Sequence, residues 1–248
     1  MILLAVDTSS DQGSLALAQE NELLELIPLP PKRHSATLHG EIVHLLERHG
    51  LATRDIQGFG VVAGPGSFTG VRVGLAAVKG LAEVNEKPVV AVSSLETLAV
   101  AAYAQFSQHS PAIRNGRALA PILDARRGQV FATAYRSAAF GEADPLQEVE
   151  CFHPLVKEMV CSLKSFLERM QEAGIEEPVF CGTELDHYGP EIEKRGWKLS
   201  PRIVVSPFLA ASLLQIAAER LRKGLGSSAL DVDANYVRSS DAELFFKG

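Results

Sequence analysis

The sequence predicts a two-lobed α/β protein in which a βββαβαβα unit occurs twice. Its 248 residues are enough to bury a core in each of two compact halves. In both halves short apolar runs alternate with amphipathic helical stretches. The first strand of each half ends at an aspartate, Asp7 and Asp124. We therefore expect an N-terminal lobe over residues 1–105 and a C-terminal lobe over residues 106–248.

The first half is expected to contain five strands and three helices. An apolar run at residues 2–6 is typical of a buried strand, and the next two runs, 13–18 and 23–27, form a hairpin around a polar turn. Residues 35–48 place Leu38, Ile42 and Leu45 on one helical stripe. The remaining elements are a strand at 57–63, a helix at 69–84, a strand at 88–92 and a helix at 95–104.

The second half repeats this order of elements without a repeat of residues. The polar span 105–117 has the composition of a connection between the halves. The expected elements are strands at 118–123, 129–135 and near 147–152, a helix at 155–172, a strand at 178–181, a helix at 184–195, a strand near Ile203 and a helix at 209–223. The last helix can pack back on the first lobe.

A βββαβαβα unit used twice resembles the actin/Hsp70-like superfamily, which includes sugar kinases and has a ribonuclease H-like topology. In that superfamily two lobes clamp ATP between them. The resemblance is at the level of the fold and does not by itself imply the activity.

The composition is that of a soluble globular protein. Apolar residues make up 46% and charged residues 22%, and no apolar run approaches the roughly 18 residues of a membrane span. The opening apolar run lacks a basic leader, so we expect no secretion signal. Cys151, Cys161 and Cys181 form no CxxC pair, which favours buried apolar roles in a reducing cytoplasm.

The net charge of −6 argues against tight nucleic-acid binding by this chain alone. The basic pairs Lys32-Arg33 and Arg126-Arg127 are short and lack interleaved aromatic residues. Solvated surface is therefore their favoured interpretation.

A glycine-rich turn, Gly64-Pro65-Gly66, is expected between a buried strand and a helix. Gly66 can take the positive φ of a type II turn, and Ser67 or Thr69 can cap the helix. The spacing matches neither the dinucleotide fingerprint nor the phosphate loop, and no lysine follows. A structural turn is favoured over nucleotide binding, and a capping role for Ser67 over a nucleophilic one, because GxSxG is absent.

The helix after this turn has one face with almost no side-chain bulk. Gly70, Gly74 and Ala77 recur at i, i+4 and i+7. Glycine inside a helix costs roughly 0.5–1 kcal/mol relative to alanine, so close packing against the sheet or another helix is expected to compensate.

Several motifs resemble the bacterial TsaB (YeaZ) family. The string GPGSFTGVRVG at Gly64 to Gly74 follows Asp7-Thr8-Ser9 and the helix start HSATL at residues 34–38. The strings SSLETLA at 93–99 and DARRGQVF at 124–131 are also similar to that family. The likeness is strong over residues 2–131 and then weakens to a C-terminal Tyr236-Val237-Arg238, where Ala234 replaces a frequent proline.

The resemblance implies a non-catalytic scaffold subunit that supports the catalytic partner TsaD in making N6-threonylcarbamoyladenosine at position 37 of tRNAs reading ANN codons. It implies a cytoplasmic protein without membrane contact, a homodimer when alone, an ATPase subunit TsaE in the complex, and tRNA contact only through the complex. No cofactor is required by this chain, and ATP and Mg²⁺ belong to the partner subunits.

The same resemblance implies a partner interface on the two helices 35–48 and 69–84, with TsaD or a second copy. Its expected residues are Leu38, Ile42, Leu45, Gly70, Arg72, Gly74, Ala77 and Leu81. We accordingly expect Gly74→Leu to block assembly and to leave the monomer folded.

A metalloprotease is disfavoured by the histidine spacing. His34, His39, His44 and His49 are five residues apart, and each step turns about 140° around a helix, which scatters them. Neither HExxH nor HxxxH occurs, so no metal site is expected and solvated histidines are favoured.

A stand-alone ATP-binding enzyme of the same superfamily is the alternative. Asp7 is followed by Thr8-Ser9 and Asp124 by an alanine, where the superfamily has a glycine that lets phosphate approach. We therefore interpret Asp7, Thr8, Ser9 and Asp124 as a vestigial nucleotide cleft with structural roles.

Overall fold

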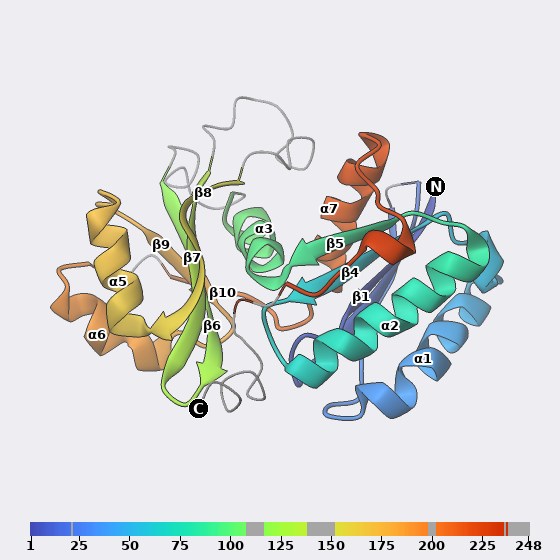
Figure 1. Ribbon diagram of the computed structural model, residues 1–248, viewed down its shortest axis with the longest axis horizontal. Coiled ribbons are helices and arrows are strands. Elements are labelled where there is room, and N and C mark those ends of the chain that lie inside the picture. Colours follow the sequence, from blue (N-terminus) through green and yellow to red (C-terminus); the bar gives the residue numbers. More distant parts are fainter. Residues whose placement is uncertain (21, 108–116, 138–151, 198–201, 236, 238–248) are drawn as a thin grey trace, which may run out of the picture.

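The computed structural model describes residues 1–20, 22–107, 117–137, 152–197, 202–235 and 237. Within them the chain forms two mixed sheets and a set of helices arranged in layers (Figure 1).

The two sheets have the same topology. The first consists of β1 (Ile2–Asp7), β2 (Ser14–Gln19), β3 (Glu22–Pro28), β4 (Gly58–Gly64) and β5 (Val89–Ser93), in the order β3-β2-β1-β4-β5. The second consists of β6 (Ala118–Arg126), β7 (Gln129–Ser137), β8 (Phe152–Ser162), β9 (Val179–Gly182) and β10 (Arg202–Val204), in the order β10-β9-β6-β7-β8. In each sheet the first strand pairs antiparallel with the second and parallel with the fourth. The predicted fold class, a duplicated unit of actin/Hsp70-like topology, is confirmed.

Helices cover both sheets on both faces. The outer face of the first sheet carries α1 (His34–Arg48) and α2 (Phe68–Asn85), and the outer face of the second carries α5 (Leu163–Glu172) and α6 (Gly189–Lys194). Between the sheets lie α3 (Ser94–Ser107) and α7 (Ala210–Arg222) (Figure 1). Short 3₁₀ turns occur at Thr53–Asp55, Asp186–Tyr188 and Ala229–Asp231.

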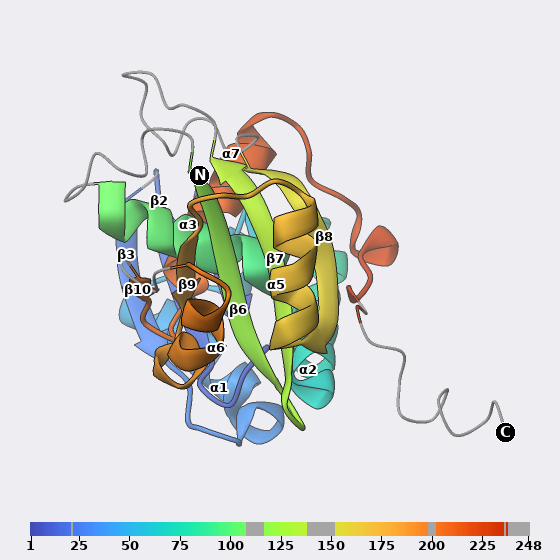
Figure 2. The ribbon, with the colours of Figure 1, turned by 90° about the vertical axis from the view of Figure 1, so that its left-hand side faces the viewer.

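The two inner helices each pack on the sheet of the other half. Leu213 and Ala217 of α7 join the cluster beneath the first sheet, beside Leu3 and Val62. In the other direction, α3 packs on the second sheet (Figure 2), and its Leu98 belongs to the same buried cluster as Leu119 of β6. The boundary expected at residues 105 and 106 falls in the last turn of α3, and the division into two folding units stays a prediction.

One long element of the second half was predicted wrongly. The sequence predicts a helix over 155–172, but residues 155–162 belong to β8, and the helix α5 begins only at Leu163. Pairing with β7 along the length of β8 overrides the local helical pattern. The missed signal is Ser162, which caps α5 by accepting a hydrogen bond from the Ser165 N–H at 3.2 Å. Most of the strand expected near 147–152 lies outside the described residues.

The helix predicted at 184–195 is also shorter than expected. It divides into the 3₁₀ turn Asp186–Tyr188 and α6, because Pro190 can be accommodated only in a first helical turn. Most of the connection at 105–117, as well as Tyr236 and Arg238, lies outside the described residues. Among the described residues, no helix is long and apolar enough to cross a membrane.

Candidate functional site

The glycine-rich turn joins β4 to α2, but its geometry differs from the expected type II turn. The positive φ of 104° belongs to Gly64, and the Gly64–Pro65 peptide bond is cis. Gly66 serves close approach instead, because a Cβ atom there would lie 2.3 Å from the Ser9 carbonyl oxygen. The turn is therefore packed against the end of β1.

The start of α2 is closed by contacts within this chain. The Ser67 N–H donates to the Ser9 carbonyl at 2.7 Å, and the Ser67 hydroxyl accepts from the Gly70 N–H at 3.2 Å. The predicted capping role of Ser67 is confirmed. These two N–H groups therefore already have protein acceptors.

The side chain of Thr8 fills the small face of α2. A Cβ atom on Gly70 would lie 2.1 Å from the Thr8 carbonyl oxygen, and one on Gly74 would lie 2.3 Å from Thr8 Oγ1. The Thr8 hydroxyl also donates to the Gly70 carbonyl at 2.7 Å. The glycines are thus required by packing within the chain. The expectation that Gly74→Leu leaves the monomer folded is wrong, because a leucine has no space there.

Asp7 is buried at the end of β1 with its carboxylate engaged. Oδ1 accepts from the Ser9 N–H at 2.9 Å and from the Ser9 hydroxyl at 2.7 Å. Burial raises the pKa of the Asp7 carboxyl above its ordinary value, although the Ser9 hydrogen bonds oppose this. The residues predicted as a vestigial cleft at this strand end, Asp7, Thr8 and Ser9, are all buried.

Asp124, at the corresponding place in the second half, differs from Asp7 in its surroundings. It is exposed, and its Oδ1 accepts from the Arg126 N–H at 2.8 Å in a tight hairpin. The role of these aspartates in nucleotide binding stays a prediction, but both carboxylates hold local turns.

The residues predicted for a partner interface divide into buried and accessible sets. Leu38, Ile42 and Leu45 of α1 are at most 2% exposed and form the core under the helices, and Gly70 and Gly74 are buried against Thr8. Arg72 is exposed, while Ala77 and Leu81 are partly buried. The interface stays a prediction, but direct contact through the buried set is incompatible with this packing.

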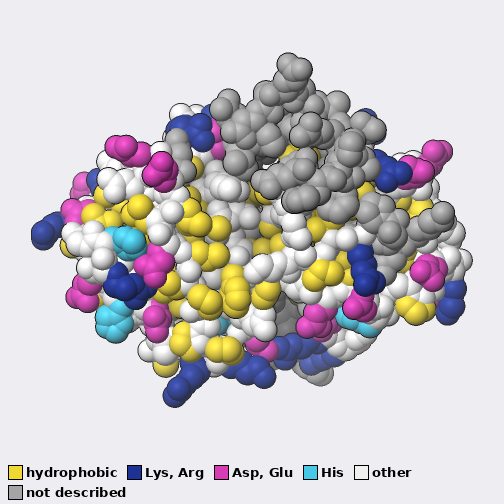
Figure 3. All heavy atoms as spheres, turned by 180° about the vertical axis from the view of Figure 1, so that it is seen from behind, with side chains coloured by type: hydrophobic (Ala, Val, Ile, Leu, Met, Phe, Trp, Pro, Cys, Tyr) yellow, Lys and Arg dark blue, Asp and Glu magenta, His cyan; other side chains and the backbone are white. Residues whose placement is uncertain are grey.

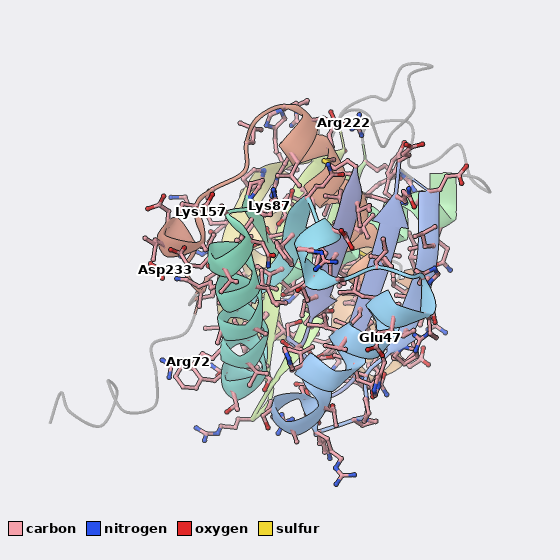
Figure 4. The ribbon with its side chains drawn as sticks, turned by 90° about the vertical axis from the view of Figure 1, so that its right-hand side faces the viewer. Glu47, Arg72, Lys87, Lys157, Arg222 and Asp233 are labelled. Atoms are coloured by element: carbon pink, nitrogen blue, oxygen red, sulfur yellow. The ribbon has the colours of Figure 1, made fainter. Side chains whose placement is uncertain are left out.

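A different set of residues forms the accessible surface of the two helices. We call it the α1–α2 outer face; it consists of Ala36, Gly40 and Val43 of α1 and of Val73, Ala76, Gly80 and Val84 of α2. Val84 is 84% exposed, and a Cβ atom on Gly40 or Gly80 would meet nothing within 4 Å. The two helices lie side by side, with the exposed side chains of Arg72 on α2 and Glu47 on α1 (Figure 4). Its seven residues are small or apolar, and the exposed carboxylates Glu47 and Glu83 lie on the same outward stripes of the two helices.

The histidines of α1 do not converge. His34 is buried, contrary to the expectation of solvated histidines, and its Nε2 has no hydrogen-bond partner. Burial lowers the pKa of His34, although Asp7 and Asp11 oppose this. His49 binds Glu25 at 2.9 Å, whereas His39 and His44 are exposed. Among the described residues, no group of three or more ligating side chains could hold a metal ion.

Sequence reasoning missed a polar cluster between the lobes. The Glu158 carboxylate of β8 accepts from the Ser93 hydroxyl, from the Tyr135 hydroxyl at 3.0 Å and from the Asn235 side-chain amide at 2.7 Å. These partners come from both sheets and from the C-terminal segment. Burial, and next the Glu158 charge, raises the pKa of Tyr135 above its ordinary value. No local motif marks this cluster, because its members are far apart in the sequence.

Comparisons with known proteins place the chain in a family. The family described as "TsaD: tRNA N6-adenosine threonylcarbamoyltransferase" matches residues 29–178. The Escherichia coli tRNA threonylcarbamoyladenosine biosynthesis protein TsaB is 30% identical over 98% of this chain and 96% of its own length. The chain belongs to the TsaB family. The predicted resemblance is thereby confirmed.

Other TsaB relatives support the assignment over different lengths. The Bacillus subtilis TsaB is 38% identical, but the match covers 55% of this chain and 56% of that protein. A crystal structure from Pseudomonas aeruginosa, described as similar to peptidase YeaZ, has a TM-score of 0.74 and 25% identity, and it covers 96% of this chain and 99% of that one. The fold of this TsaB-family chain is therefore shared across its length.

Proposed function

We propose that this TsaB-family chain is a non-catalytic subunit of the complex that makes N6-threonylcarbamoyladenosine at position 37 of tRNAs reading ANN codons. It holds TsaD in its active arrangement, TsaE joins as the ATPase subunit, and the chain alone forms a homodimer in the cytoplasm. ATP and Mg²⁺ are bound by the partner subunits. The chemistry then belongs to TsaD, and this chain supplies a surface.

The closed end of β1 supports a non-catalytic role. Phosphate binding by the superfamily's turns needs free backbone N–H groups and space beside them. In this chain the Ser67 N–H is bound to the Ser9 carbonyl, and Thr8 lies against Gly70 and Gly74. A nucleotide phosphate would have to displace these contacts.

The α1–α2 outer face is the observation that carries the proposal. It presents small and apolar side chains on two adjacent helices, with Gly40 and Gly80 leaving the backbone open to close approach. Apolar surface of this kind is stabilised by burial against a partner. Two helices from TsaD, or from a second copy, could pack on it by ridges and grooves.

The proposal is tested by reconstituting modification. The chain is mixed with TsaD, TsaE, ATP, a source of the threonylcarbamoyl group and an unmodified tRNA, and threonylcarbamoyladenosine is measured by mass spectrometry of nucleosides. We expect modification to depend on this chain, and the chain alone to turn over no ATP. Modification at the same rate without the chain, or ATP turnover by the chain alone, would contradict the proposal.

A variant of the outer face tests the interface separately. Gly80→Arg adds bulk and charge at an open, exposed helical position, where arginine is a better helix former than glycine by about 0.5–1 kcal/mol. We expect it to weaken TsaD binding by at least tenfold in calorimetry while the monomer stays folded. Val204→Arg, at a 48% exposed residue of β10, is the matched control and should bind normally. Equal binding by both variants would place the interface elsewhere.

A further inference from the structure

The segment that follows the last helix runs along the first half of the molecule and reaches the second. We call residues 226–235 the C-terminal strap. It passes beside α2 in Figure 1, and Figure 4 shows Asp233 of the strap next to that helix. In the view from behind, charged side chains of both signs are interspersed with hydrophobic ones (Figure 3). The strap and α2 thus share one side of the molecule.

The strap is docked on the first half by backbone pairing and by burial. Ser227 exchanges two backbone hydrogen bonds with Val89 at the edge of β5, each of 2.9 Å. Ala229 and Val232 are 4% and 3% exposed, and they belong to the core cluster that contains Ala82 of α2. The strap therefore supplies part of the core on which α2 packs.

A side chain of α2 also binds the strap directly. Lys79 is partly buried, and its Nζ donates to the Val232 carbonyl at 2.7 Å. A hydrogen bond with a charged donor is roughly twice as strong as one between neutral groups. The carbonyl that Lys79 binds lies three residues before Asn235.

Asn235 fastens the strap to both halves. Its backbone N–H donates to the Ala63 carbonyl of β4 at 2.7 Å, and its side-chain amide donates to the Glu158 carboxylate of β8 at 2.7 Å. A Cβ atom on Gly64 would lie 3.0 Å from the Asn235 carbonyl oxygen, so the strap is also in close contact with the end of β4. Through Glu158 the strap reaches the second sheet.

The link between these two anchors is short. Val232 begins it in an extended conformation, with φ of −86° and ψ of 124°, and only Asp233 and Ala234 lie before Asn235. Because a chain spans at most about 3.3–3.6 Å per residue, three residue steps span at most about 10–11 Å. A shift of α2 that carries Val232 with it is therefore passed on to Asn235.

We propose that the C-terminal strap couples α2 to the second half of the molecule, so that a partner held on the α1–α2 outer face also fixes the two halves against each other. The inference rests on the proposed function, because it takes TsaD as the protein bound to that face. In the docked state Lys79 and Glu158 both hold the strap, and in the released state neither does. A partner that packs on α2 in its present position favours the docked state, and linkage requires that the docked strap strengthens partner binding by the same factor.

The coupling is tested first in the chain alone, by hydrogen exchange of the Asn235 amide measured by NMR. Lys79→Met removes the donor to Val232 and keeps an apolar side chain, while the control Lys164→Met removes an exposed lysine from α5. We expect the Asn235 amide to exchange about tenfold faster in Lys79→Met and at the unchanged rate in the control. Lys79→Arg keeps a charged donor and should restore most of the protection.

The amide of Leu4, in the buried strand β1, reports global unfolding in the same spectra and should exchange at the same rate in all four proteins. Equal exchange of the Asn235 amide in Lys79→Met and Lys164→Met would overturn the inference. Faster exchange of Leu4 in step with Asn235 would also overturn it, because the effect would then come from the stability of the whole fold.

The second test measures TsaD binding by calorimetry. We expect Lys79→Met and Asn235→Ala each to weaken binding about fivefold. The double variant should be no weaker than either single variant, because both substitutions break one connection. Effects that multiply in the double variant would indicate two independent contacts and would contradict the coupling.

The outcomes separate this inference from the proposed function. If TsaD does not bind the unchanged chain, the proposed function fails, and exchange in the chain alone still decides whether Lys79 and Asn235 are coupled. If exchange is coupled but both variants bind TsaD normally, the strap joins the halves independently of the outer face, and the inference is overturned.

Discussion

Asp7 shows how a buried carboxylate is held by the turn that follows its own strand. Asp7 is 1% exposed, and its carboxylate accepts hydrogen bonds from the Ser9 N–H and hydroxyl. Buried carboxylates of this kind are stable only when hydrogen bonds offset the loss of hydration. Here the hydrogen bonds offset it in part, because the pKa of Asp7 remains raised by burial.

The raised pKa predicts that Asp7→Asn stabilises the protein at neutral pH. In the unfolded chain the pKa of Asp7 is near the ordinary value of 3.8, whereas in the folded protein it is raised. Between these two pKa values unfolding releases a proton, so the free energy of unfolding falls as the pH rises from the unfolded-state pKa through the folded-state pKa. Above the folded-state pKa the buried carboxylate is ionised, and unfolding returns its charge to water. Asparagine can accept the same Ser9 hydrogen bonds without ionising. Urea unfolding should show a higher free energy of unfolding for the variant at pH 7, and the difference should shrink below about pH 3.

Asp233→Asn, at an exposed carboxylate, serves as the control and should show no comparable gain. An Asp7→Asn variant that is less stable than the unchanged chain at pH 7 would show that the ionised carboxylate stabilises the fold.

At the scale of elements, α2 contains glycines in two different settings, one set packed closely against the chain and one glycine open to solvent. Gly70 and Gly74 face the turn after β1 and admit Thr8, whereas Gly80 faces outward into open space. The sequence spacing of Gly70, Gly74 and Ala77 predicts close packing correctly, but it does not identify the neighbour. That neighbour is the chain itself.

The contrast along α2 predicts opposite effects for the same substitution. Gly74→Ala places Cβ 2.3 Å from Thr8 Oγ1 and should destabilise the protein by about 1–3 kcal/mol. Gly80→Ala meets nothing within 4 Å and should stabilise it by about 0.5–1 kcal/mol through helix propensity. Both changes in the free energy of unfolding are to be measured from the midpoints of denaturant unfolding curves. If both variants shift stability in the same direction, the packing of Thr8 against Gly74 is not the determinant.

At the scale of the whole molecule, the lobes are tied together at several levels. The inner helices α3 and α7 each pack on the sheet of the other half. Asn235 bridges the halves, because its backbone N–H donates to the Ala63 carbonyl at 2.7 Å and its side-chain amide donates to the Glu158 carboxylate at 2.7 Å. A hinge between these lobes would have to break both apolar and polar contacts. The C-terminal segment around Asn235 thus acts as a strap across the molecule.

The contact between Asn235 and Glu158 can be tested by exchanging the hydrogen-bond donor and acceptor between the two residues. Asn235→Asp sets two carboxylates against each other and should cost about 1–2 kcal/mol of stability, with faster hydrogen exchange of the residue 235 amide. Adding Glu158→Gln restores a donor opposite the new acceptor and keeps an oxygen for Tyr135. The double variant should recover most of the loss. Failure of this rescue would mean that Glu158 and Asn235 are not coupled.

The sequence by itself determined the local elements and the family. Apolar periodicity located the helix stripe of Leu38, Ile42 and Leu45, and the side-chain chemistry of Ser67 gave the cap of α2, because both depend on neighbours a few residues away. The order of elements was enough to predict a duplicated fold. The motif strings were enough to place the chain in the TsaB family.

The tertiary structure alone decided which surfaces are free and which distant residues meet. The stripe on α1 is buried in the core, and the same apolar pattern could equally have lain on the surface, since only packing against the sheet separates the two. Residues 155–162 became strand because β7 offers hydrogen bonds that no local pattern reveals. Asp11 joins Lys32 to Arg126, and Glu158 joins Ser93 to Asn235, because contacts between distant segments arise only when the chain has folded.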